Sequence, residues 1–112
     1  MEDAPILDIT LERAMESATA LRLLCNQTLP LKRSAHVNAL GLSLHEQARD
    51  AKIQVTAAIV RMKVLGQTGI ENDLKVILKV IEAIDKKFAE ENYIDGDLTA
   101  KLTKLLSDED SK

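Results

Sequence analysis

The chain has 112 residues, 46% of them hydrophobic and 29% charged, and its formal net charge is −3. This balance is typical of one globular domain, and it argues against a disordered chain and against broad non-specific binding of nucleic acid. No apolar run approaches the ~18 residues that cross a bilayer, and the acidic first residues lack the basic segment of a signal peptide. A single cysteine, Cys25, allows no internal disulfide. We therefore expect an intracellular protein, cytoplasmic or nuclear, that forms a single helical domain over 1–112 with frayed ends at about 1–6 and 107–112.

The first predicted helix covers about 9–27. Its apolar residues recur every three or four positions, which places them on one face of a helix. They are Leu7, Leu11, Ala14, Ala18, Leu21 and Cys25. Asp8 is the predicted N-cap, because its carboxylate can accept hydrogen bonds from the free backbone N–H groups of the first turn. Pro30 ends the element, since the residue before a proline is steered away from helical geometry.

The second apolar stripe follows Ser34, a possible N-cap, and stops before Gly66. Its members are Val37, Leu40, Leu44, Ala48, Ala51, Val55, Ala58, Met62 and Leu65. Gly41 leaves two interpretations open: one helix over 34–66, or a short helix over 34–41 followed by a longer one over 44–66. Ser43 and Glu46 would form a capping box at the start of the longer helix. Because glycine costs about 1 kcal/mol in a helix interior, we favour an interruption at Gly41.

The third predicted helix covers about 70–92 and follows a second capping-box pattern, formed by Thr68 and Glu71. It is apolar on more than one side, which favours a central position in the fold. Its main seam, which we expect to be almost fully buried, is Leu74, Ile77, Ile81 and Ile84.

A short fourth helix is predicted after Asp97, its expected N-cap. Its apolar residues are Leu98, Leu102, Leu105 and Leu106. No segment alternates as a strand would, and the connections between helices are short. The sequence therefore predicts an all-α fold, a small antiparallel bundle of four helices, or five if Gly41 interrupts the second.

The segment Thr68-Gly69-Ile70, followed by Leu74 and Leu78-Lys79, resembles the turn and helix of the N-terminal domain family of the transcription elongation factor TFIIS. The resemblance covers residues 68–79, and the Trp-Lys pair that closes the family's pattern is missing. It implies a helical domain that docks other proteins.

The chain offers no recognisable catalytic, cofactor or metal site. His45-Glu46 begins like a zinc-binding H-E-x-x-H helix, but Arg49 stands where the second histidine belongs. Cys25 lies on the apolar stripe of its helix, and nothing near it in sequence would lower its pKa, so we interpret it as a structural thiol. We expect no enzyme activity, no cofactor and no metal.

Apolar residues outnumber what one stripe per helix requires, and the excess predicts an exposed patch. The predicted partner-binding residues are Ile53, Val60, Val64, Val76 and Val80, with a basic rim of Arg61, Lys63, Lys75 and Lys79. Such a surface favours a non-catalytic protein-interaction module, an adaptor or scaffold, that presents a helical surface or groove to a partner helix or peptide, preferably an acidic one. Three alternatives stay open: coverage of these residues by the first and last helices, a self-assembling homodimer, and a nucleic-acid-associated or transcription-factor-type docking domain.

Overall fold

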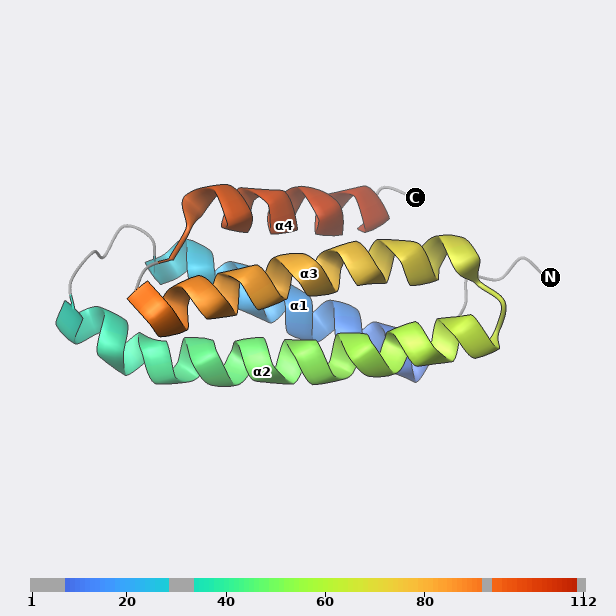
Figure 1. The fold of residues 1–112 in the computed structure, drawn as a ribbon, viewed down its shortest axis with the longest axis horizontal. Helices are drawn as coiled ribbons and strands as arrows, with labels where there is room; N and C mark the ends of the chain where they lie inside the picture. Colours follow the sequence, from blue (N-terminus) through green and yellow to red (C-terminus); the bar gives the residue numbers. More distant parts are fainter. Residues whose placement is uncertain (1–7, 29–33, 92–93, 111–112) are drawn as a thin grey trace.

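The fold is an all-α bundle of four helices joined up-down-up-down (Figure 1), as the sequence predicts. The computed structural model describes residues 8–28, 34–91 and 94–110, with the backbone alone at 27–28, 34–43 and 108–110. The helices are α1 (Ile9–Thr28), α2 (Ser34–Val64), α3 (Thr68–Glu91) and α4 (Gly96–Asp110). No helix in the described part of the chain is long and apolar enough to span a membrane.

The helices form an elongated bundle that measures 51 × 23 × 18 Å. α1 and α3 each pack mainly against α2 and α4, so the four helices enclose one shared core. The expected central position of α3 is therefore wrong, because α3 occupies one corner of the bundle and has an exposed outer face like its neighbours. α2 is about 46 Å long at 1.5 Å per residue, and the shorter α4 covers only part of that length (Figure 1).

Two aspartates cap helix starts. Asp8 Oδ1 accepts hydrogen bonds from the N–H groups of Thr10 and Leu11, at 2.9 and 3.3 Å, which confirms Asp8 as the cap of α1. α4 is capped by Asp95 and not by Asp97, since Asp95 Oδ1 accepts from the N–H groups of residues 97 and 98 at 2.9 and 3.2 Å. The Asp95 carbonyl also accepts a hydrogen bond of 3.0 Å from the buried Thr99 hydroxyl.

α2 is one continuous helix through Gly41, so the favoured interruption is wrong. A glycine in a helix interior costs about 1 kcal/mol, which is small once the helix is nucleated and stabilised by tertiary packing. This packing begins at Leu44, which is 1% exposed, and continues along the buried stripe of α2. The side chains of Val37 and Leu40, the Ser34 cap, residues 1–7 and the connection at Pro30 lie outside what the structure describes.

The turn between α2 and α3 is a Schellman motif. Gly66 adopts a positive φ of 72°, its N–H donates to the Lys63 carbonyl at 3.1 Å, and the Gln67 N–H donates to the Met62 carbonyl at 2.9 Å. The Glu71 N–H then donates to the Gln67 carbonyl at 2.9 Å, so Gln67 occupies the N-cap position and Thr68 is the first residue of α3. Thr68 is therefore not the N-cap, and the capping box predicted from Thr68 and Glu71 is wrong.

The core contains aliphatic side chains from all four helices. The predicted seam of α3 is confirmed, with Leu74 and Ile77 1% exposed and Ile81 and Ile84 completely buried. Five fully buried alanines, which allow close approach of α1 and α2, are Ala14, Ala18, Ala48, Ala51 and Ala58. Leu65 departs from its predicted stripe and is 42% exposed, because α2 ends one residue before it. At the other end, α4 continues to Asp110, into the tail expected to fray.

Candidate docking surface on α2

Four of the five predicted patch residues are exposed. Ile53, Val60 and Val64 of α2 are 59%, 58% and 72% exposed, and Val76 of α3 is 42% exposed. Val80 is only 4% exposed, so its assignment to a partner surface is wrong. On α3, Val80 lies on the side opposite to Asp85, whose carboxylate meets α2, and this side therefore turns toward α4.

The exposed residues of α2 form a straight row. Ile53, Val60 and Val64 share one helix face with Ala57, which is also exposed, at spacings of 4, 3 and 4 residues. We call these four residues the α2 row. The row lies about half a turn around the helix from the completely buried Val55, Ala58 and Met62 of the core face. The sequence analysis missed Ala57, although the 4-3-4 spacing from Ile53 would have identified it.

Val76 does not belong to the α2 row. It lies on the α4 side of α3, whereas the row points away from the core on the outer face of α2. The predicted basic rim divides in the same way. Arg61 and Lys63 flank the row, but Lys75 and Lys79 are exposed on α3, where Lys75 forms an ion pair of 3.1 Å with Glu71.

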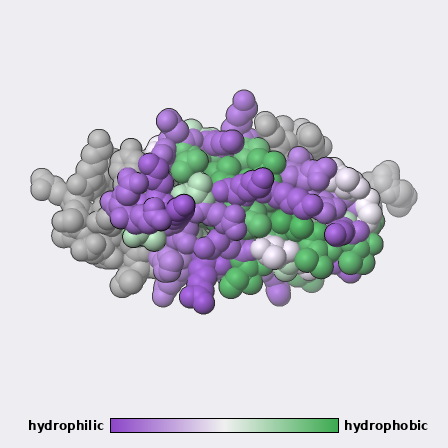
Figure 2. Space-filling view, in the orientation of Figure 1, coloured by the Kyte–Doolittle hydropathy of each residue, from purple (hydrophilic) through white to green (hydrophobic). Residues whose placement is uncertain are grey.

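The charged α2 residues that flank the row near its C-terminal end are both basic, and one of them, Arg61, is paired with Asp8. Arg61 lies on the α1 side and Lys63 on the α3 side, and the sequence has no acidic residue between Asp50 and Glu71. Figure 2 shows hydrophobic side chains gathered over the end of the bundle where α2 meets α3, on the right of the view, and a second hydrophobic area in the upper centre, while hydrophilic side chains dominate left of centre. The row is therefore an apolar strip with basic edges.

The Arg61 side chain is held by α1. Its Nε donates to Asp8 Oδ2 at 2.8 Å. The Arg61 hydrogen bond holds the pKa of Asp8 below its usual value against the opposing effect of burial, and the N–H groups of Leu11 and Thr10 act in the same direction as Arg61. One carboxylate thus caps α1 and fixes the position of a cation at the edge of the row.

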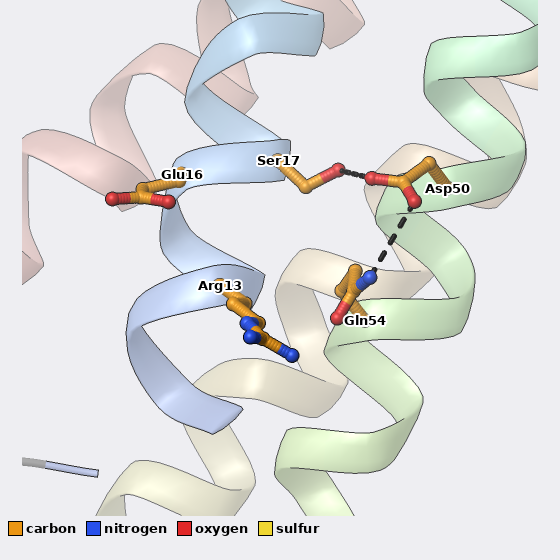
Figure 3. A pocket seen from close by; sticks show the side chains of 5 residues that line it. All are labelled: Arg13, Glu16, Ser17, Asp50 and Gln54. Carbon is orange, nitrogen blue, oxygen red and sulfur yellow. Dashed lines mark hydrogen bonds between the residues drawn. The ribbon is translucent and has the colours of Figure 1, made fainter. Parts of the chain in front are cut away.

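Beyond Ile53, toward the N-terminus of α2, the same face becomes polar. A shallow hollow of about 250 Å³ lies beside it, between α1 and α2. Its lining residues are Arg13, Glu16 and Ser17 from α1 and Asp50 and Gln54 from α2 (Figure 3). The Ser17 hydroxyl donates to Asp50 and accepts from Gln47 Nε2 at 3.0 Å, so it joins two helices. No histidine or lysine that could activate Ser17 as a nucleophile takes part in these hydrogen bonds.

A second polar cluster joins α2 to α3. Asp85 is 7% exposed, and its two carboxylate oxygens lie 2.9 Å from His45 Nδ1 and 2.8 Å from Lys52 Nζ. Burial raises the pKa of Asp85, but the hydrogen bonds from Lys52 and His45 outweigh it, so the pKa lies below its usual value. Among the described residues no group of three or more metal-ligating side chains is found.

Cys25 is completely buried, as expected of a structural thiol. Burial raises its pKa to about 11, although a hydrogen bond with the Thr99 side chain acts in the opposite direction. The thiol is therefore protonated at neutral pH and unsuited to nucleophilic attack.

Comparison with protein-family models, curated proteins and solved structures finds no match to this chain. The short resemblance over 68–79 to the TFIIS N-terminal domain family gains no support from them.

Proposed function

We propose that this protein is a non-catalytic interaction module whose α2 row docks a helix with acidic side chains from another protein. The observation that carries the proposal is the row itself, in which Ile53, Val60 and Val64 are each more than half exposed. Exposed apolar residues scattered singly are ordinary, whereas an aligned set often marks an interaction site.

The spacing of the row favours a helix as its occupant. Residues at alternating intervals of three and four form the seam by which two helices pack side by side. The small side chain of Ala57 in the middle of the row allows a partner helix to approach closely. An extended peptide that adds a strand would need a sheet edge, and the described residues contain no strand. A peptide in the polyproline II conformation would need an aromatic-lined groove, and the row contains no aromatic residue.

The charge beside the row favours an acidic partner. Arg61 and Lys63 lie on opposite flanks, so a helix seated on the row would place its own flanking residues near both cations. The same cations count against a parallel second copy of this chain, because that pairing would bring the basic ends of the two rows together, whereas an antiparallel copy would bring them beside Glu46 and Asp50. A homodimer is accordingly the alternative that the experiment must distinguish.

Photo-crosslinking from the row tests the proposal. A photoreactive amino acid replaces Ala57, and the protein is irradiated in an extract of its source cells, followed by mass spectrometry of the crosslinked peptide. We expect the peptide to come from an acidic amphipathic helix of another protein. The matched control carries the same group at Ala100, which is exposed on α4. A crosslink to this chain's own α2, or no crosslink above the Ala100 control, would contradict the proposal.

A further inference from the structure

α4 contributes fewer buried apolar side chains to the core than any other helix. Among the described side chains, α4 buries Leu102 and Leu106, whereas α1, α2 and α3 bury four, six and five apolar residues. Burial of apolar surface is the main force that holds a helix in a bundle, and local opening occurs where that burial is smallest. α4 is therefore the helix that leaves the bundle at the lowest cost in free energy.

The interfaces among the other three helices do not pass through α4. α2 packs along both α1 and α3, and an ion pair of 2.8 Å reinforces each interface, Asp8 with Arg61 and Asp85 with Lys52. α4 lies across the bundle from α2 and packs on α1 and α3 (Figure 1). When α4 leaves, both interfaces of α2 therefore keep their packing and their ion pairs.

The charge at the C-terminal end of α4 weakens the helix itself. Residues 108–110 are all acidic, and the last turn of α4 holds no basic residue. Acidic side chains at this end oppose the helix dipole, and adjacent acids also repel one another. The part of α4 that follows Leu106 is therefore poorly stabilised by its own sequence.

α4 covers the single cysteine of the chain. Cys25 of α1 is completely buried, and its thiol forms a hydrogen bond with the side chain of Thr99 on α4. On α3, the side that carries the 4% exposed Val80 turns toward α4. Opening of α4 would thus uncover a thiol on α1 and an apolar side of α3.

We infer that α4 is a strap that opens and closes over α1 and α3 while α1, α2 and α3 stay folded together, and that its opening exposes Cys25. The inference does not depend on the proposed function, because the α2 row lies on the outer face of α2 and α4 packs on α1 and α3. The open form presents an apolar face that the closed form lacks.

Alkylation of Cys25 measures the opening, because the chain has no other thiol. The native protein is treated with excess iodoacetamide, from which iodide leaves as the thiolate forms a carbon–sulfur bond, and labelling is followed by mass spectrometry at increasing urea. Without urea we expect labelling at least about tenfold faster than global unfolding allows. Its dependence on urea should be weak, because opening one helix exposes little surface. Labelling that matches global unfolding in rate and in urea dependence would overturn the inference.

Two destabilising substitutions distinguish α4 opening from other routes to the thiol. Leu102→Ala removes a completely buried contact of α4 and should speed labelling at least about tenfold. Asp85→Asn, the matched control, weakens the link from α3 to α2 on the side opposite α4. It should lower global stability and leave the labelling rate without urea unchanged.

Either of two results would contradict the strap. If Leu102→Ala does not change the labelling rate, the reagent reaches Cys25 without opening of α4. If Leu102→Ala and Asp85→Asn speed labelling equally, Cys25 is exposed only by global unfolding. Leu106→Val removes one methylene group from the same face of α4 and should speed labelling by a smaller factor, which provides a second measurement if Leu102→Ala does not fold.

Discussion

At the scale of single residues, the buried carboxylate of Asp85 links α3 to α2 through two side chains. It is 7% exposed and accepts from two side chains of α2, one of them a lysine and the other a histidine. A buried charge is tolerated when its oxygens are paired in this way. Removing the charge would leave Lys52 beside a neutral group in a partly buried position.

Asp85→Asn should therefore destabilise the protein by about 1–3 kcal/mol at neutral pH, the range for loss of a hydrogen-bonded buried charge. Because the folded-state pKa of Asp85 is lowered, its carboxylate contributes stability above the unfolded pKa of about 3.9 and loses it as pH falls through the folded value. Urea denaturation at several pH values should show that the difference in the free energy of unfolding between wild type and variant becomes smaller below about pH 4. Glu82→Gln, exposed on the same helix, is the control. If the difference in the free energy of unfolding stayed the same at low pH, the charge of Asp85 would not be the source of the stability.

At the scale of elements, two glycines lie near the turn between α2 and α3, but only the one inside the turn is needed for its backbone conformation. Gly66 has a φ of 72°, whereas Gly69 lies inside α3 without a positive φ. A Cβ added at either position would meet no other atom within 4 Å. Alanine substitutions at the two sites therefore test the effect of backbone conformation without steric crowding.

Gly66→Ala should destabilise the protein by about 1–2 kcal/mol, because an L-residue resists positive φ. Gly69→Ala should stabilise it by up to about 1 kcal/mol, since alanine is the better helix former. Thermal unfolding of both variants checks the pair. Destabilisation by both changes would show that the turn needs something other than the φ of Gly66.

The sequence predicted the elements well because each helix has one dominant apolar period. The bounds of α1 and the buried seam of α3 follow directly from that period and from Asp8. The errors occur where the competing energies are small. Gly41 opposes the helix by only about 1 kcal/mol, and Asp95 and Asp97 are equally good N-cap residues two positions apart, so residue type alone does not choose between them.

The candidate surface was only partly predictable for a different reason. Periodicity identified Ile53, Val60 and Val64 as surplus to the core, and all three are exposed. It could not determine which neighbour covers a second stripe, so Val80, which turns toward α4, was assigned to the surface. The pairing of His45 with Asp85 joins residues 40 positions apart and leaves no periodic signal.

At the scale of the whole molecule, the bundle has one core that all four helices share. Ile81 is completely buried within it, whereas Val60, a residue of similar chemistry on α2, is 58% exposed. A single core predicts that damage at one buried position weakens every helix together, because none has a separate core of its own.

Ile81→Ala should cost about 2–5 kcal/mol through lost burial and the cavity left behind, a large share of the ~5–15 kcal/mol typical of a domain. Val60→Ala should change stability by less than about 0.5 kcal/mol, as is usual for exposed positions. Urea denaturation gives both free energies, and amide hydrogen exchange shows whether protection in the four helices falls together. A loss confined to α3 in the Ile81→Ala protein, or a cost below about 0.5 kcal/mol, would show that the helices do not depend on one core. An unfolding cost for Val60→Ala as large as that for Ile81→Ala would mean that the α2 row serves the fold and is not free for a partner.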